Sequence, residues 1–362
     1  YPLLVRNRVK YADNPLYFAS KVSDMALIGA DIVGGCCGTT PEYIKDLVET
    51  VDLTPAVKLS ETAAKKECEK PIIKKSFFRN TDGTIKDKKL IAVELAPPFG
   101  ADDKKLLEAA HSLKGLGVDV LTFPDSPSGR TRIDSVLMAQ KVKNETGFDV
   151  MPHICCRDKN AIAMRSTFLG ASINGINNFL IITGDPIPVM ARQVVKSVFN
   201  FDSVGLMRIA DEMNSDSLEN QPITYGGAIN QGRLRIEAEI KRVQKKMDAG
   251  AEFFLTQPVF TGEDARRLRR VKEETGARIL CGIMPLVSRK NALFMKNEIS
   301  GVNVTDEVIE RYPESTSRED GENIGVELAK EMIDITKDFA DGYYFSFPFN
   351  RTYLLKRIIT EI

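Results

Sequence analysis

The sequence has no excess of charge of either sign, no long apolar run and no glycine-rich dinucleotide fingerprint. Its 50 Lys and Arg residues balance 50 Asp and Glu residues, so no overall field draws it toward nucleic acid or an anionic membrane. No apolar stretch approaches the roughly 18 residues of a membrane span, and the N-terminus lacks the pattern of a signal peptide. We therefore expect a cytoplasmic protein that binds a small molecule, and neither nucleic acid nor a membrane.

Cysteine and histidine are also scarce, with six and two residues in the chain. The adjacent pairs Cys36–Cys37 and Cys155–Cys156 do not make a secreted disulfide framework, so we expect thiols. His153 lies close to the second pair, but neighbouring residues of a strand point in different directions and no further ligand cluster follows. We expect no metal at that position.

Composition divides the 362 residues into three segments. Residues 57–89 are rich in Lys and Arg, poor in large apolar side chains and carry the turn Thr81–Thr84, which predicts a linker. Residues 1–56 show a helical stretch near 19–29, a short strand at 31–33 and a helix that begins at Pro41. Such a segment is too small to close a barrel or to bury much core.

Residues 90–362 repeat short β-branched or aromatic runs separated by helical periodicity. No G-x-G-x-x-G accompanies the first run, so a doubly wound dinucleotide fold is disfavoured and a (β/α)8 TIM barrel is predicted. The eight expected strands are Leu90–Leu95, Val118–Phe123, Phe148–Ile154, Asn177–Thr183, Pro222–Ile229, Glu252–Gln257, Ala277–Ile283 and Gly342–Phe347.

The carboxyl ends of barrel strands form the active-site rim, and polar residues gather there. Glu94 lies between apolar neighbours, where desolvation would keep a carboxyl protonated as a general acid requires; a structural ion pair is the alternative. Asp185 follows a glycine and precedes a proline, which fits a ligand contact or a turn residue. Gln257 ends a strand with an amide that could read a heterocycle or stay structural.

Several motifs occur in order along the predicted barrel, and together they resemble the methylenetetrahydrofolate reductase family over residues 90–362. The motifs are Val93–Pro98, Pro152–Cys156, Leu180–Pro186, Lys246–Ala251, Phe254–Gln257, Gly282–Pro285 and Asn350–Arg351.

The resemblance implies a flavin-dependent barrel that reduces 5,10-methylenetetrahydrofolate to 5-methyltetrahydrofolate. Glu94 would donate a proton to the departing nitrogen of the substrate, Asp185 would stay ionised and orient the pterin, and Gln257 would hydrogen-bond it. Reduced FAD would supply the hydride.

The resemblance also implies cofactor and substrate contacts. Arg351 matches a residue near the substrate, and Lys246 is expected as an exposed charge beside the FAD diphosphate. The positions that match flavin contacts are Thr122, His153, Gly184, Asp185, Asn230 and Lys246.

Some positions depart from the family pattern. Thr183 stands where many members carry Arg, and Arg289 replaces an aromatic that in some members stacks on nicotinamide or folate. Two electron donors therefore stay open: NAD(P)H, and another protein or carrier. A homo-oligomer also stays open.

The N-terminal segment resembles the end of a zinc-dependent homocysteine methyltransferase. Its hallmark, Gly34–Pro41, holds Cys36 and Cys37, two of three zinc thiolates, while the third Cys is absent. We expect residues 1–56 to be a C-terminal fragment of a second (β/α)8 barrel that binds no zinc without the rest of that barrel. The pairing resembles a bifunctional methyltransferase–reductase.

Two other functions remain compatible with the residues of the rim. One is a flavin-free lyase with the same barrel, and the other is a folate-binding remnant without catalysis. A flavin absorbance spectrum separates the first from the reductase, and turnover separates the second.

Overall fold

The computed structural model describes residues 3–5, 8–10, 14–27, 30, 32–35, 38–51, 74–299, 301–315 and 317–359. The chain divides into two compact units, residues 1–71 and residues 72–362. Each unit is described by itself below. In the described part of the chain, every helix is too short or too polar to cross a membrane.

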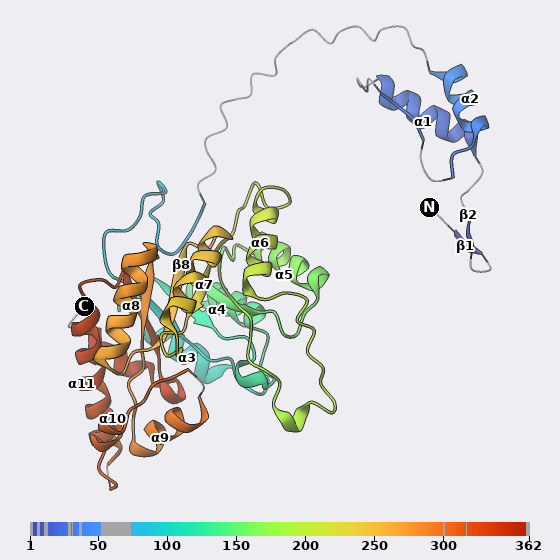
Figure 1. The fold of residues 1–362 in the computed structure, drawn as a ribbon. Coiled ribbons are helices and arrows are strands. Elements are labelled where there is room, and N and C mark those ends of the chain that lie inside the picture. The colour runs from blue at the N-terminus through green and yellow to red at the C-terminus, as the bar shows by residue number, and fades with distance from the viewer. Residues whose placement is uncertain are drawn as a thin grey trace. The chain divides into compact units, whose positions relative to one another are not determined.

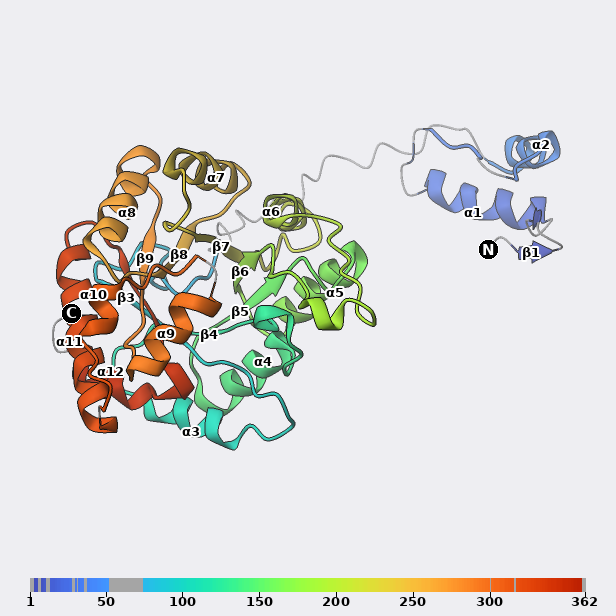
Figure 2. The same cartoon turned by 60° about the horizontal axis from the view of Figure 1, so that its bottom comes forward.

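The larger unit is a closed barrel of eight parallel strands, as the sequence predicted (Figures 1 and 2). The strands follow one another around the barrel in chain order, and the last one pairs with the first. Each expected strand is present, with ends within two residues of the predicted ones. The strands are β3 (Leu90–Glu94), β4 (Val120–Phe123), β5 (Val150–Cys155), β6 (Asn178–Ile182), β7 (Thr224–Ile229), β8 (Phe253–Pro258), β9 (Ile279–Ile283) and β10 (Gly342–Ser346).

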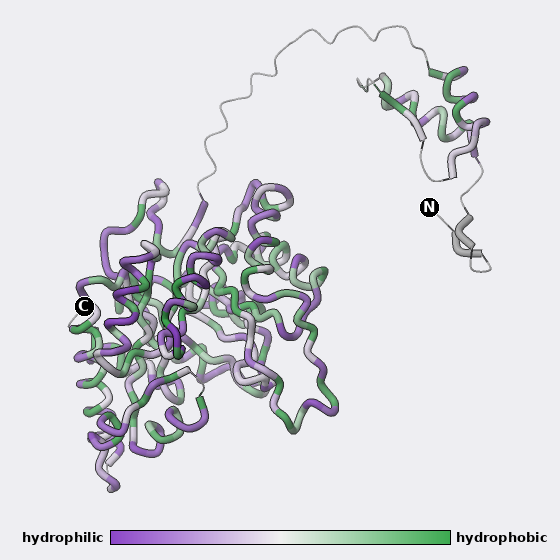
Figure 3. Tube along the Cα trace, viewed as in Figure 1, coloured by the Kyte–Doolittle hydropathy of each residue, from purple (hydrophilic) through white to green (hydrophobic). Residues whose placement is uncertain are grey.

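Helices surround the strands in the view down the barrel in Figure 2. Helix α8 is amphipathic: it is mostly hydrophilic along its length in Figure 3, yet it buries Leu268 and Val271 toward the strands. The helices are α3 (Lys104–Ser112), α4 (Ser135–Thr146), α5 (Ala161–Ile173), α6 (Ser203–Asn214), α7 (Ile236–Asp248), α8 (Gly262–Thr275), α9 (Arg289–Glu298), α10 (Asp306–Glu310), α11 (Arg318–Thr336) and α12 (Leu355–Ile358). Single 3₁₀ turns are η1 (Pro127–Gly129), η2 (Val189–Ala191), η3 (Pro348–Asn350) and η4 (Thr352–Leu354).

Alternate residues of each strand face the inside and the outside of the barrel, because the side-chain period of a strand is two. In β3, Leu90 and Ala92 belong to the interior cluster, whereas Ile91 and Val93 pack in the layer between strands and helices. The next inward position after Ala92 is Glu94. The same count places the last inward side chain of every strand at one end of the barrel.

Part of the segment predicted as a linker packs on the barrel instead. Phe77 and Phe78 are fully buried and belong to the interior cluster with Leu90 and Phe253. The rings of Phe77 and Phe253 meet edge to face, with centroids 5.0 Å apart. The basic composition of residues 57–89 concealed these two side chains, which fill the end of the barrel where the strands begin.

The smaller unit holds a hairpin of β1 (Leu3–Val5) and β2 (Arg8–Lys10), followed by α1 (Pro15–Leu27) and α2 (Pro41–Thr50). The helix predicted at Pro41 is confirmed. The strand expected at 31–33 is not found at Ile32 or Val33, where the chain is irregular, and Asp31 lies outside the described residues.

Helices α1 and α2 pack through Ala19, Val22, Leu47 and Val51. This two-helix core does not show the second barrel fragment that the sequence suggested. Cys36 and Cys37 lie outside the described residues.

Candidate active site

A cavity of about 720 Å³ opens where the barrel strands end. Its wall includes Glu94, His153, Gln257 and Tyr344, each at an inward position of its strand, and Asp185 from the loop after β6. A second cavity of about 580 Å³ lies at the opposite end, where β5 and β6 begin. Active sites of this fold occupy the carboxyl ends of the strands, so the first cavity is the candidate.

Glu94 is held by two hydroxyl groups of the neighbouring strand β10. Tyr344 donates its phenol hydrogen to Oε2, and Ser346 Oγ donates to Oε1 at 3.0 Å. Burial raises the pKa of the Glu94 carboxyl, while the two hydroxyls and the charge of Arg132 act in the opposite direction. The desolvation that the sequence suggested is therefore present, and it favours the protonated form.

His153 lines the same cavity as Glu94 and is a neutral imidazole. Burial lowers its pKa to about 3. Its Nε2 lies 3.2 Å from Thr122 Oγ1, the last inward side chain of β4. Thr122 is fully buried and does not line the cavity, so it contacts the site through His153 and Tyr344.

Asp185 is exposed at the rim, and its Oδ2 accepts a hydrogen bond of 2.7 Å from the backbone N–H of Ser128. The loop of Ser128 is strained, since Ser126 and Ser128 both adopt positive φ, at 43° and 56°. Strain of this kind persists where surrounding contacts enforce it and is common at functional sites. Gly184 has φ of 95°, and a Cβ there would lie 3.0 Å from Cys155 Cβ. Glycine is thus required before Asp185.

Gln257 occupies the last inward position of β8 and lines the cavity. Its backbone carbonyl is fixed by the buried Gln231, whose Nε2 donates to it at 2.9 Å. The carbonyl of Gln257 also accepts from Thr256 Oγ1 at 2.7 Å. These contacts fix the main chain and leave the side-chain amide facing the cavity.

A family model of methylenetetrahydrofolate reductases matches residues 79–359. The chain belongs to the methylenetetrahydrofolate reductase family. It is accordingly an oxidoreductase of this class. A second model, of homocysteine S-methyltransferases, matches residues 1–51.

Curated relatives agree with this family. The chain is 24% identical over 261 residues to the 5,10-methylenetetrahydrofolate reductase of Buchnera aphidicola, a match that covers 69% of the chain and 85% of the relative. It is 26% identical over 208 residues to the Salmonella typhimurium enzyme, covering 56% and 66%. A crystal structure of 2,3-dimethylmalate lyase aligns with a TM-score of 0.42 at 15% identity over 75% of this chain and 81% of that chain.

In this family member, three further residues expected at the site lie outside the cavity wall, as Thr122 does. Lys246 is not exposed as expected: it is 5% exposed, its Nζ donates to the carbonyl of Ala228 at 2.6 Å, and burial lowers its pKa to about 8. Asn230 accepts a hydrogen bond from the N–H of Gly232. Arg351 pairs with Glu322 at 2.8 Å.

The reductase barrel also presents residues that the sequence did not single out. Tyr344 and Ser346 were missed because their role depends on the pairing of β10 with β3, which brings both inward-facing side chains next to Glu94. Arg192 lines the cavity from the loop after β6. Arg289 donates to the carbonyls of Ile309 and Tyr312 at 3.1 Å each.

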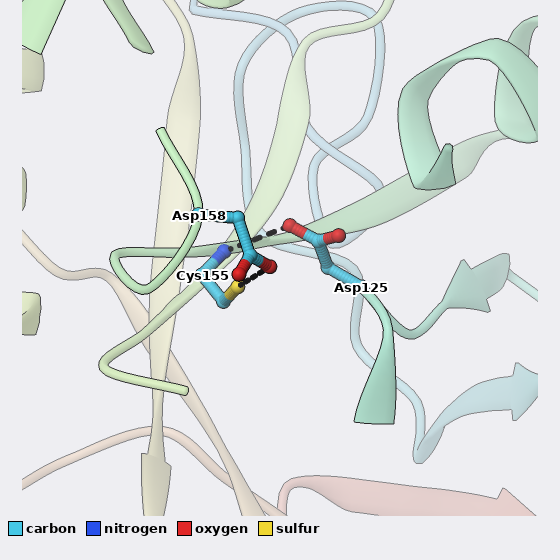
Figure 4. Close-up of side chains that lie close together, drawn as sticks. All are labelled: Asp125, Cys155 and Asp158. Atoms are coloured by element: carbon cyan, nitrogen blue, oxygen red, sulfur yellow. Dashed lines mark hydrogen bonds between the residues drawn. The ribbon is translucent and has the colours of Figure 1, made fainter. Parts of the chain in front are cut away.

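Asp125, Cys155 and Asp158 converge beside the cavity, with their ligand atoms within 4.8 Å of one another (Figure 4). Cys155 donates its N–H to Asp125 at 3.1 Å and its thiol to Asp158 at 3.5 Å. Burial raises the pKa of the Cys155 thiol, and Arg157 pairs with Asp158 at 2.6 Å. A protonated thiol and a neutralised carboxylate are poor cation ligands, so we interpret this group as a structural network.

Proposed function

We propose that this family member reduces 5,10-methylenetetrahydrofolate to 5-methyltetrahydrofolate with FAD, and that Glu94 is the general acid. The observation that carries the proposal is a desolvated carboxyl at the floor of a strand-end cavity, with burial favouring its protonated form. The family match supports the reaction class.

The cavity suits the ring system of a flavin. Leu180, Ile182 and Leu255 give it apolar walls, and its volume lies within the range of about 300–1,000 Å³ typical of small-molecule sites. FAD, when bound, would supply the hydride. Arg192 is the cation that lines this cavity and is better placed to meet a diphosphate than Lys246, which is bound to Ala228.

The residues of the chain divide the remaining chemistry among them. Opening the imidazolidine ring requires a proton on the departing nitrogen, and Glu94 would donate it. The iminium that results is cationic, and the carboxylate of Asp185 would stabilise it. The amide of Gln257 can donate and accept hydrogen bonds together, as the amide-like edge of a pterin requires.

Replacing the acid should separate two half-reactions. Reduction of the flavin needs no proton from Glu94, whereas its reoxidation by methylenetetrahydrofolate does. We predict that Glu94→Gln leaves the first nearly intact and slows the second by about 10²–10⁴-fold. Stopped-flow flavin absorbance measures each half separately. Equal slowing of both halves would make Glu94 a flavin contact or a structural residue, and slowing of neither would refute its role.

The matched N-terminal residues support a second, separate proposal. Residues 1–51 match homocysteine S-methyltransferases, so we propose that this reductase is the C-terminal part of a bifunctional methyltransferase–reductase. Zinc binding by Cys36 and Cys37 would then require a complete upstream barrel. Zinc analysis of this chain, and of a chain that carries a complete upstream barrel, tests whether zinc binding depends on that barrel.

A further inference from the structure

Two side chains of strand β10 donate hydroxyl hydrogen bonds to the two carboxyl oxygens of Glu94. In the β3–β10 register, Ser346 lies opposite Glu94 and Tyr344 lies opposite Ala92. Tyr344 and Ser346 are two residues apart, so both point into the barrel beside the carboxyl. Tyr344 donates to Oε2 and Ser346 donates to Oε1.

Few charged side chains act on Glu94 and its two hydroxyl donors. Arg132, in the loop between β4 and α4, acts on Glu94 through space, but its Nη1 donates to the carbonyl of Pro97 at 2.7 Å and its guanidinium stacks on Phe99 at 3.8 Å. From β5, His153 contributes a neutral ring. The hydroxyls of β10 are therefore the groups that hydrogen-bond the carboxyl directly.

A buried acid that gives up its proton leaves a carboxylate that must be stabilised where water is scarce. Hydrogen bonds to a charged acceptor are about twice as strong as bonds between neutral groups. Two hydroxyl donors supply this stabilisation without a fixed positive charge, which would keep the acid ionised before the reaction. The arrangement thus matches an acid that must release a proton and take it up again in each turnover.

We propose that Tyr344 is a positioning residue for the proton donor, and that its phenol orients Glu94 and stabilises the carboxylate formed when the proton passes to the departing nitrogen. The inference rests on the proposed function and deepens it. The proton moves from Glu94 to the substrate nitrogen, while the O–H bond of Tyr344 stays intact and its hydrogen bond to Oε2 strengthens.

Removing the phenol hydroxyl should change the pH range in which Glu94 acts. Without Tyr344 as donor the carboxylate is less stable, so Glu94 holds its proton to higher pH. The folate half-reaction requires protonated Glu94, and its rate falls as pH rises through the pKa of that group. We predict that Tyr344→Phe moves this alkaline limb upward by about one to two pH units, the equivalent of one lost hydrogen bond to a charged group.

The strand offers a matched control at the next residue. Tyr343 is also buried, but it points to the helix layer, where its hydroxyl lies 3.3 Å from the carbonyl of Ile333. Tyr343→Phe removes the same atom from the opposite face of β10. Ser346→Ala removes the second donor to Glu94 and serves if Tyr344→Phe does not fold.

Two measurements are made on the full chain loaded with flavin. In the first, protein reduced with dithionite is mixed with methylenetetrahydrofolate across a pH series, and flavin reoxidation is recorded. In the second, ¹³C NMR of protein labelled at glutamate carboxyls follows the titration of Glu94 without substrate, assigned by its loss in Glu94→Gln. We expect the midpoint pH of the reoxidation rate and the midpoint pH of the Glu94 titration to change together. Both should rise in Tyr344→Phe, rise less in Ser346→Ala and stay in place in Tyr343→Phe.

A midpoint that stays in place or falls in a folded Tyr344→Phe would overturn the inference, and so would the same result in Ser346→Ala if Tyr344→Phe does not fold. An equal rise in Tyr343→Phe would also overturn it. Failure of the proposed function has a different signature, because Glu94→Gln would then keep the full rate of the folate half-reaction wherever the midpoint lies.

Discussion

At the scale of single residues, burial favours the neutral forms of titratable side chains in the cavity wall, Glu94 and His153 among them. Desolvation raises the pKa of Glu94 and lowers that of His153. The sequence predicted the desolvation of Glu94, because its neighbours on the strand are apolar residues. It could not predict that Lys246 is buried, because the space for its side chain comes from Gly227 on another element: a Cβ there would lie 2.9 Å from Lys246 Cδ.

The neutral His153 makes the stability of the barrel depend on pH. In the unfolded chain a histidine takes up a proton below about pH 6.5, while His153 in the folded protein does so near pH 3. Stability is therefore full above pH 6.5 and falls as pH decreases, by about 2–3 kcal/mol between pH 6.5 and 4.5. We predict that His153→Gln loses less free energy of unfolding over this interval than the wild type.

Urea unfolding at pH 6.5, 5.5 and 4.5 measures the effect. His111→Gln is the control, because this second histidine is exposed on α3. An equal pH dependence in the wild type and His153→Gln would show that His153 is not held neutral by the fold.

At the scale of secondary structure elements, the period of two decides which side chains reach the cavity. The eight strands were predictable from their apolar runs and spacing, and so were the site residues that end strands, such as Glu94 and Gln257. Tyr344 and Ser346 were missed because their role depends on which strand pairs with β3, and closure of the barrel brings β10 there from the far end of the chain. Pairing between distant segments leaves no local signal.

The segment before β3 provides a test of where the barrel begins. Phe77 is fully buried against Phe253, so Phe77→Ala should lower the free energy of unfolding by about 3–5 kcal/mol. Ile85→Ala, in the same segment but 51% exposed, should change it by no more than about 0.5 kcal/mol. Urea denaturation of the full chain gives both values. If both variants unfolded like the wild type, this segment would be a linker after all.

At the scale of the whole molecule, the chain joins two units with different family matches. The reductase match covers residues 79–359 and the methyltransferase match covers residues 1–51. The sequence predicted both resemblances, but its segment boundary at 89 lies later than Phe77 and Phe78, which pack inside the barrel. Composition records the average polarity of a segment, and two buried phenylalanines among many charges hardly change that average.

We propose that the cavity of the larger unit reduces a folate with FAD. The most direct measurement loads the full chain with FAD, reduces it without oxygen, adds 5,10-methylenetetrahydrofolate, and follows flavin absorbance and the folate product together. We expect that the protein retains flavin, that the flavin is reoxidised, and that one 5-methyltetrahydrofolate forms per flavin. A protein that binds no flavin, or a bound flavin that stays reduced in the presence of the substrate, would contradict it.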